Sequence, residues 1–190
     1  NEAKKRLGDN FFLTMSAWSA PANLKANGSL SGSNGGPVKP SLKKEFGSFV
    51  YDKYGSWWRR ALEQYQAVGV YPDHFSIQNE PDCDADYEST IFDPTESYDI
   101  ASYSKALNAV YTKIKGMPKQ PKILGPEALG IGWEKVQSYI NTIDKSQLYG
   151  YNFHYYHSGM NDHDARDQRY SYPDDFLGAM TQLSKDYLGK

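Results

Sequence analysis

Short apolar runs and longer stretches of helical periodicity alternate along this chain. Four runs have the length and composition of strands, and they cover residues 10–18, 75–80, 122–127 and 148–157. Apolar residues recur every three or four positions over residues 46–65, 100–114, 133–143 and 176–187, which predicts helices with one buried face. Residues 2–8 predict one further helical segment, basic near its end and closed by a glycine.

The first two strand-like runs differ in pattern. The first is almost continuously apolar, which is typical of a parallel strand covered on both faces. In the second, apolar and polar residues alternate from Phe75 to Gln78, which predicts a strand with one buried face. Pro81 has no N–H to continue a ladder, so we expect this strand to end near Glu80.

Alternation of strands and helices favours an α/β fold in which parallel strands are covered by helices. A full (β/α)8 TIM barrel has eight such units and about 250 residues. We therefore expect residues 1–190 to form one segment of a barrel, with about four of its eight units. Half a barrel leaves open strand edges and exposed apolar surface. This predicts a piece of a larger enzyme, or a split barrel that a second chain or fragment completes.

Two long polar segments interrupt the pattern, at residues 19–41 and 82–95. Loops of this length are usually functional, and the alternative for the first segment is a flexible linker. The second segment has acidic residues at alternate positions, Asp82, Asp84, Asp86 and Glu88, which resemble part of a Ca²⁺-binding loop. An EF-hand needs glycine at its sixth position, where this segment has Tyr87. We therefore expect a solvated acidic loop and no metal site.

Charge and composition narrow the possible functions. The net charge is −2 and the basic residues are dispersed, which argues against nucleic acid and anionic membranes as partners. We find no apolar run of 18 residues, no signal-peptide pattern and no nucleotide or metalloprotease motif, so no cofactor is expected. Cys83 is the one cysteine, which excludes an internal disulfide. The chain has 16 Tyr, 8 Phe and 4 Trp, which slightly favours a carbohydrate ligand.

Candidate chemistry gathers at the ends of the predicted strands. In a (β/α)8 protein the carboxyl ends of the strands form the active-site face. The residues at these ends are Trp18, Asn79, Glu80, Glu127, Asn152, His154 and Tyr156. A Glu at a strand tip has a cleft on one side and apolar packing beneath, which suits general acid/base catalysis. The alternative for Glu80 is a structural carboxylate at a strand end, and for Trp18 a core tryptophan.

Several motifs resemble those of one enzyme family. They are Trp18-Ser19-Ala20-Pro21 with Leu24-Lys25-Ala26-Asn27-Gly28, then Gln78-Asn79-Glu80-Pro81-Asp82 with Asp86-Tyr87-Glu88-Ser89, and finally His154-x-Tyr156. In this order they resemble the third to sixth units of glycoside hydrolase family 30, in its xylanase type. The resemblance covers about residues 9–190. Two positions depart from the family, Asn23 where an aromatic residue is often found and Cys83 where a tryptophan is often found.

The resemblance implies roles for individual residues. Glu80 would be the general acid/base and Asn79 would bind a sugar hydroxyl. Trp18 would stack on a sugar, and Tyr87 would lie beside the acid/base. Tyr156 would reach the nucleophile or the sugar, whereas His154 could equally be structural.

In the family the nucleophile is a Glu at the end of the seventh strand, a unit that would follow this chain. Glu127 does not match that position, so we interpret it as a site-lining residue or a buried acid. The β-rich side domain of the family is also outside this chain. The implied activity is a secreted, retaining endo-β-glycosidase acting on β-1,4-xylan or glucuronoxylan. The alternatives are another family 30 specificity, such as β-glucosidase or β-1,6-glucanase activity, and a non-catalytic carbohydrate-binding half-barrel.

Overall fold

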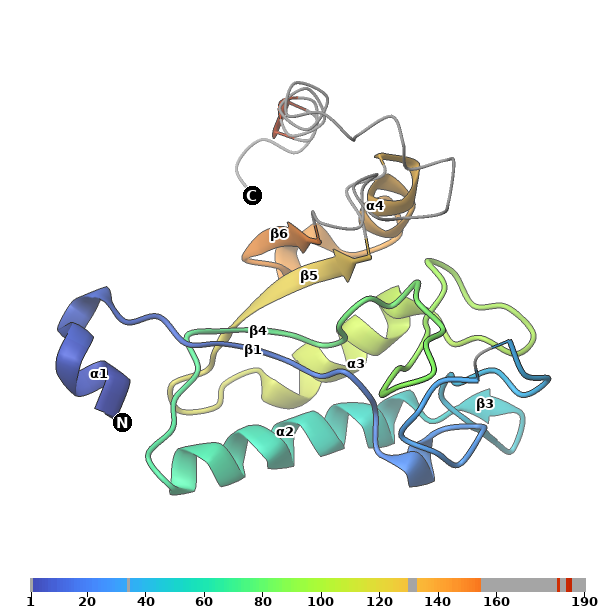
Figure 1. Cartoon of the computed structure of the whole chain (residues 1–190), viewed down its shortest axis with the longest axis horizontal. Helices are drawn as coiled ribbons and strands as arrows, with labels where there is room; N and C mark the ends of the chain where they lie inside the picture. Colours follow the sequence, from blue (N-terminus) through green and yellow to red (C-terminus); the bar gives the residue numbers. More distant parts are fainter. Residues whose placement is uncertain (1, 34, 130–132, 155–180, 182–183, 186–190) are drawn as a thin grey trace.

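A four-stranded parallel sheet forms the centre of the chain in a computed structural model that describes residues 2–33, 35–129, 133–154, 181, 184 and 185 (Figure 1). Its strands are β1 (Thr14–Ser16), β4 (His74–Ser76), β5 (Lys122–Ala128) and β6 (Gly150–Phe153). They lie in the order β1-β4-β5-β6, so each strand pairs with the next along the chain. This arrangement confirms the predicted α/β fold with parallel strands.

Helices follow the strands as the periodicity predicts. The α-helices are α1 (Glu2–Leu7), α2 (Tyr51–Ala67), α3 (Tyr103–Ile114) and α4 (Trp133–Ile140). Short 3-10 turns are η1 (Gly8–Asn10), η2 (Ala22–Leu24) and η3 (Lys145–Gln147). Figure 1 shows α2 and α3 side by side, beneath β1 and β4 in the view. Among the described helices, none is long and apolar enough to cross a membrane.

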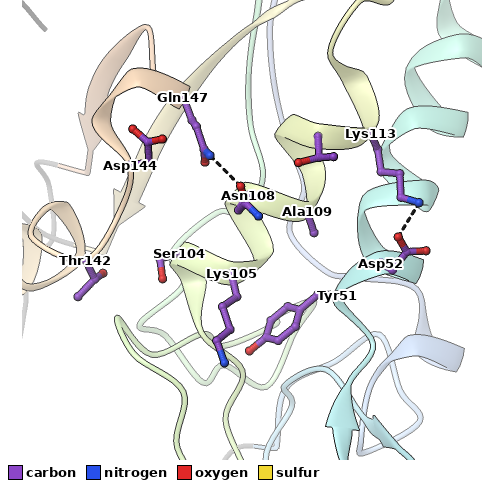
Figure 2. A pocket seen from close by; sticks show the side chains of 11 residues that line it. Tyr51, Asp52, Ser104, Lys105, Asn108, Ala109, Lys113, Thr142, Asp144 and Gln147 are labelled. Atoms are coloured by element: carbon purple, nitrogen blue, oxygen red, sulfur yellow. Dashed lines mark hydrogen bonds and ion pairs between the residues drawn. The ribbon is translucent and has the colours of Figure 1, made fainter.

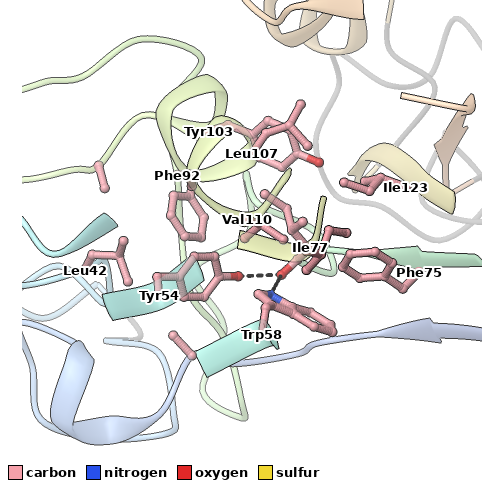
Figure 3. Close-up of a cluster of buried hydrophobic side chains, with 14 of the residues drawn as sticks. Leu42, Tyr54, Trp58, Phe75, Ile77, Phe92, Tyr103, Leu107, Val110 and Ile123 are labelled. Atoms are coloured by element: carbon pink, nitrogen blue, oxygen red, sulfur yellow. Dashed lines mark hydrogen bonds between the residues drawn. The ribbon is translucent and has the colours of Figure 1, made fainter. Parts of the chain in front are cut away.

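The main core lies between the sheet and helices α2 and α3 (Figure 3). Parallel pairing sets Met15 beside Phe75, and Phe75 beside Ile123. Phe75 is fully buried, and its ring centroid lies 4.8 Å from that of Trp58 on α2. Trp58 is 3% exposed, which agrees with its place on the predicted apolar stripe.

Helix α2 also supports the backbone just beyond β4. The carbonyl oxygen of Ile77 accepts hydrogen bonds from the Tyr54 hydroxyl at 2.5 Å and from Trp58 Nε1 at 3.2 Å (Figure 3). Ile77 lies three residues before Glu80. The helix therefore holds the segment that leads from the sheet to the candidate acid/base.

Strand β4 departs from the prediction of a single buried face. Ser76 and Gln78 are as fully buried as Phe75 and Ile77. Parallel strands are normally covered on both faces, and polar side chains are tolerated there when they are hydrogen-bonded. Gln78 Nε2 donates to the carbonyl oxygens of Trp18 at 2.7 Å and Asn79 at 2.9 Å. The alternation was therefore a poor guide to exposure here.

The expected start of the second helix was wrong. Residues 44–49 form a hairpin of β2 (Lys44–Glu45) and β3 (Ser48–Phe49), and α2 begins only at Tyr51. Phe46 and Gly47 have φ angles of 50° and 84°, as a two-residue hairpin turn with both central residues left-handed requires. Phe46 is completely exposed at this turn, although its spacing matched the buried stripe of the helix.

Other elements also differ in length or packing from the prediction. Strand β1 is shorter than the apolar run at 10–18, and Phe12 within that run is 69% exposed. The segment at 19–41 packs against the segment at 82–95 rather than acting as a linker, since Ile91 N donates to Pro40 O at 3.1 Å. The predicted helix at 176–187 and the end of the last predicted strand lie outside the described residues, apart from three isolated positions.

We predict that Tyr54→Phe destabilises the full-length protein by about 1–2 kcal/mol, because the Ile77 carbonyl loses a buried donor. Chemical denaturation measures the change in the free energy of unfolding. Tyr65→Phe, at a 44% exposed tyrosine of the same helix, is the control and should change stability by less than about 0.5 kcal/mol. Equal effects of the two substitutions would contradict the proposed support of Ile77.

Candidate active site

Backbone hydrogen bonds hold the carboxyl ends of the strands side by side. Asn79 N donates to Ala17 O at 2.8 Å, and Glu80 N donates to Glu127 O at 3.0 Å. His154 N donates to Ala128 O at 2.9 Å. The pairing between strands therefore continues past the formal end of β4 and β6. It brings the side chains of three consecutive strands to one place.

The backbone adopts an uncommon conformation at both carboxylates. Glu80 has a φ angle of 46° and Glu127 one of 60°, in the left-handed region that side chains with a Cβ rarely adopt. Such residues cost about 1–3 kcal/mol each and occur preferentially at functional sites. The residue at 126 follows a cis peptide bond, Gly125–Pro126. These φ angles turn two acidic side chains away from the regular pattern of a strand.

His154 bridges the two carboxylates. Its Nδ1 lies 2.6 Å from Glu80 Oε1, and its Nε2 lies 3.3 Å from Glu127 Oε1. Ser16 on β1 donates from Oγ to Glu127 Oε2 at 2.7 Å. The side chains of Glu80 and Glu127 are 5% and 11% exposed, and that of His154 is 19% exposed. We refer to Glu80, His154 and Glu127 as the carboxylate–histidine triad.

The triad carries a positive charge at its centre at neutral pH. Hydrogen bonds to Glu127 and then to Glu80 raise the pKa of His154 to about 9, while burial opposes that shift. The imidazolium therefore donates from both ring nitrogens, one to each carboxylate. Charge-assisted hydrogen bonds of this kind are stronger and more directional than neutral ones. The triad fixes the orientation of the Glu80 carboxyl group from one side.

Two exposed aromatic residues, which we call the aromatic wall, lie beyond the ends of β1 and β4. Trp18 follows β1, Tyr87 lies in the segment after β4, and their ring centroids are 5.7 Å apart at an interplanar angle of 52°. The residues are 51% and 43% exposed, respectively, whereas Asn79 is 7% exposed. Trp18 is therefore not a core tryptophan. Exposed, paired aromatic faces of this kind can stack on the apolar face of a sugar ring.

The structure brings the candidate residues into contact in two pairs. Glu80 and His154 are in direct contact, Trp18 and Tyr87 contact each other, and Asn79 is adjacent to Glu80 in the chain. Tyr156 lies outside the described residues. Glu127 is a buried, hydrogen-bonded acid, in agreement with its interpretation from the sequence. In the described part of the chain, no three His, Cys, Asp or Glu side chains are grouped as metal ligands would be.

Two contacts were missed by the sequence analysis. Ser16 contacts Glu127 across the sheet, and its one signal was a polar residue within an apolar run. Asp82 Oδ1 accepts a hydrogen bond from Leu129 N at 2.8 Å, which ties the segment after Glu80 to the end of β5. That contact joins residues 47 positions apart, and no spacing in the sequence indicates it.

A separate hollow of about 630 Å³ lies in the helix layer, among α2, α3 and η3 (Figure 2). Its lining is mainly polar, with an ion pair of 2.5 Å between Lys113 and Asp52 and a hydrogen bond from Gln147 to Asn108. The residues of the triad do not line it. Its place on the outer helices, away from the strand ends, argues against a catalytic role.

We predict that His154→Gln removes a pH-dependent part of the stability of the full-length protein. The pKa of His154 is raised from 6.5 to about 9 on folding, so its contribution is fully present below pH 6.5 and is lost as the pH rises through 9. The difference in unfolding free energy between wild type and variant, measured by denaturation, should be largest near pH 6 and shrink by pH 9.5.

Ser16→Ala serves as the comparison for this experiment. It removes the hydrogen bond that the uncharged Ser16 hydroxyl donates to Glu127, and it should lower stability by about 1.5–3 kcal/mol, with little dependence on pH across that range. A difference between wild type and His154→Gln that stays constant from pH 6 to 9.5 would show that the imidazolium is not held by the carboxylates.

The chain was compared with known proteins by sequence and by structure, and only the structural comparison found similar proteins. No protein-family profile matches the chain, and no curated protein matches it in sequence. Solved structures do match. The catalytic domain of GH30 xylanase C from Talaromyces cellulolyticus aligns with a TM-score of 0.63 at 20% identity, over 81% of this chain and 35% of that one.

Two further structures agree. The glycoside hydrolase family 30 subfamily 8 xylanase Xyn30A from Clostridium acetobutylicum has a TM-score of 0.62 at 23% identity, over 85% of this chain and 38% of its own. SrfJ from Salmonella typhimurium has a TM-score of 0.69 at 19% identity, over 100% of this chain and 36% of its own. The chain thus spans 35–38% of the length of these three structures. Over that span it has the fold of the TIM-barrel glycosidases.

Proposed function

We propose that the chain forms the acid/base half of a retaining endo-β-glycosidase that hydrolyses β-1,4-xylan or glucuronoxylan. The observation that carries this proposal is the buried carboxyl group of Glu80, four residues beyond the carboxyl end of β4 and hydrogen-bonded to His154. Its place at the carboxyl end of a parallel strand is where the chemistry of this barrel fold occurs. The proposal is supported by the fold and by the motifs around Glu80.

In the first step, Glu80 in its protonated form gives its proton to the leaving glycosidic oxygen and becomes the carboxylate to which His154 donates. The positive charge of His154, 2.6 Å from Glu80 Oε1, stabilises the carboxylate that remains. In the second step, the Glu80 carboxylate removes a proton from the water that attacks the glycosyl-enzyme. A hydrogen bond to one oxygen prevents the carboxyl group from rotating during both steps. Asn79 would hold the sugar 2-hydroxyl, whose hydrogen bonds strengthen in the transition state.

The nucleophile is expected from a barrel unit other than the four described here. Retaining enzymes place two carboxyl groups about 5–5.5 Å apart, and the nucleophile needs an oxygen that reaches the anomeric carbon. Both oxygens of Glu127 are already engaged, Oε1 with His154 and Oε2 with Ser16. Glu127 is therefore proposed as the residue that orients His154. A carboxylate at the end of the seventh strand would act as the nucleophile.

Xylan is proposed as the substrate on the basis of the motifs and of two structurally similar proteins, both xylanases. Another match, an endo-β1,6-glucanase with a TM-score of 0.56, defines the main alternative specificity. Polymeric glycans of this kind are degraded outside the cell, so we propose that the protein is secreted. A panel of xylan, glucuronoxylan, β-1,6-glucan and aryl β-glucoside separates these specificities. Binding of oligosaccharide without hydrolysis would indicate a non-catalytic module instead.

We predict that Glu80→Gln lowers the rate of xylan hydrolysis by about 10²–10⁴-fold in the full-length enzyme, because the leaving group is no longer protonated. An aryl xyloside with an activated leaving group should still form the glycosyl-enzyme. Turnover then stalls at deglycosylation, and added azide should restore it with retained configuration. Product analysis by NMR and burst kinetics measure these steps.

The matched control is Glu88→Gln, an exposed carboxylate in the same segment, which should leave both substrates unaffected. A purely structural Glu80 makes a different prediction. Both substrates would decline together with stability, and azide would have no effect. That outcome, in a variant that remains folded, would exclude Glu80 as the acid/base.

A separate prediction concerns Glu127→Ala. If Glu127 orients His154, the variant should hydrolyse aryl xylosides with lower kcat, and azide should give no glycosyl azide of inverted configuration. If Glu127 is the nucleophile, hydrolysis should be abolished and azide should yield that inverted product. The anomeric configuration of the product, determined by NMR, distinguishes the two roles directly.

A further inference from the structure

Lys25 is a buried lysine with an unusually complete set of hydrogen bonds. It is 2% exposed, and it lies within the first loop, residues 19–41. Its Nζ donates to the carbonyl oxygens of Leu30 at 2.8 Å, Ser31 at 2.9 Å and Ser89 at 2.5 Å, and it also lies 3.1 Å from Ser19 Oγ. A buried ammonium group is costly unless its donors are satisfied. These acceptors satisfy them.

The acceptors belong to two different loops. Leu30 and Ser31 lie in the first loop, whereas Ser89 lies in the second loop, residues 82–95. The ammonium of Lys25 therefore ties the two loops together at one point. In Figure 1 the two loops lie next to each other at the end of the molecule that carries β3, beyond the carboxyl ends of β1 and β4.

Backbone pairing runs alongside this point. Gly32 N donates to Tyr87 O at 2.8 Å, and Ser89 N donates to Leu30 O at 3.2 Å. Ser31 and Glu88 form an antiparallel bridge between these two bonds. A Cβ at Gly32 would lie 2.0 Å from the carbonyl oxygen of Ala85, so only glycine permits this approach. The loops are thus closely paired where Lys25 joins them.

The paired segments carry the aromatic wall. Trp18 directly precedes Ser19, whose Oγ contacts Lys25, and Tyr87 is two residues before Ser89, whose carbonyl oxygen accepts from it. The two rings come from loops that follow different strands, and their 5.7 Å separation depends on how those loops are held.

We propose that Lys25 is a positioning residue whose ammonium group sets the geometry of the Trp18–Tyr87 aromatic wall and thereby controls sugar binding. The role of the wall in sugar binding rests on the proposed function. The positioning of Trp18 relative to Tyr87 does not, and it can be measured without a sugar. Lys25 acts through the loops and does not itself contact the triad in the interactions described above.

The charge of Lys25 is sensitive to pH. Burial lowers the pKa of Lys25 to about 8, and the negative charge of Asp84 opposes that shift. Asp84 is half-buried and accepts hydrogen bonds from Ser33 N and Ser33 Oγ, so the prediction of a fully solvated acidic loop was wrong at this residue. The other titratable groups of the two loops are Lys39, Asp82, Cys83, Asp86, Tyr87, Glu88 and Asp93, and Lys43 follows the first loop.

Deprotonation of Lys25 should therefore loosen the loops above pH 8. A neutral amine has two N–H donors in place of three, so one carbonyl oxygen loses its partner.

The contribution of Lys25 to the free energy of unfolding changes with pH in the opposite direction. The folded pKa is below the unfolded value of 10.5, so the unfolded chain binds more protons between pH 8 and 10.5, and the contribution of Lys25 to stability rises with pH. If Lys25 were purely structural, ligand binding would not weaken over the same pH range in which its contribution to the free energy of unfolding increases.

The test uses the full-length protein labelled with 5-fluorotryptophan, in which the Trp18 resonance is identified by its loss in Trp18→Phe. Fluorine NMR should show the Trp18 resonance shifting with a midpoint near pH 8. Lys25→Met should abolish that transition and weaken the binding of xylotetraose by about tenfold at pH 7, as expected for the loss of one aromatic contact. Calorimetry measures the binding, in the Glu80→Gln background.

A second variant keeps the test valid if Lys25→Met does not fold. Asp84→Asn removes the charge that favours the ammonium but keeps an oxygen for Ser33, so the midpoint should move to lower pH. Controls are Asp86→Asn and Cys83→Ser, which should leave the midpoint in place. Lys44→Met removes a lysine that also donates to a loop carbonyl, at 2.7 Å from Tyr98 O, and should leave both midpoint and binding unchanged.

The outcomes separate this inference from the proposed function. A Trp18 transition that responds to Lys25 and Asp84, without binding of xylotetraose, would support the positioning role and contradict the function. Binding of xylotetraose that is unaffected by Lys25→Met, or a Trp18 resonance unchanged from pH 6 to 10, would overturn the positioning role. A midpoint that moves with Cys83→Ser would assign the transition to the thiol and would also overturn it.

Discussion

One positive charge held between two buried carboxylates organises the site. Two carboxylates close together in a poorly solvated place repel each other, and each loses hydration. The His154 imidazolium, hydrogen-bonded to both, compensates for that repulsion and fixes where each carboxyl group points. The two acids are bound by different ring nitrogens, Glu80 by Nδ1 at 2.6 Å and Glu127 by Nε2 at 3.3 Å, so their surroundings differ. Glu80 is bound by His154 alone among the side-chain hydrogen bonds given above, whereas Glu127 also accepts a hydrogen bond from Ser16.

This arrangement depends on features at two scales. The sheet supplies three adjacent strand ends, and hydrogen bonds beyond the strands keep those ends in register. Helix α2 supports β4 from beneath through Tyr54 and Trp58. Above the strands, two long loops pair with each other around a buried lysine and carry the exposed aromatic residues. The acids are thus held by the rigid sheet, while the surface that would contact a ligand is held by loops.

Much of this could be predicted from the sequence, for physical reasons. Alternating strand and helix periods specify parallel strands in chain order. The predicted end of the second strand near Glu80 was late, because β4 ends at Ser76, although backbone pairing continues to Glu80. Contacts between distant segments could not be predicted in this way. The bond of Ser16 to Glu127 spans 111 positions, and the partners of Lys25 lie up to 64 positions away. Periodicity also failed at Phe46, because the left-handed turn at Phe46 and Gly47 overrode helical spacing.

The positive φ angles of the two acids have an evolutionary consequence. At such positions glycine, and to a smaller extent asparagine, relieves a conformational cost that glutamate bears. Selection for stability and selection for chemistry therefore act in opposite directions at residues 80 and 127. Under the proposed function, a descendant protein released from catalysis would gain stability by replacing Glu80 early. The proposed role of the carboxyl group would explain why glutamate occupies a position that its backbone conformation disfavours.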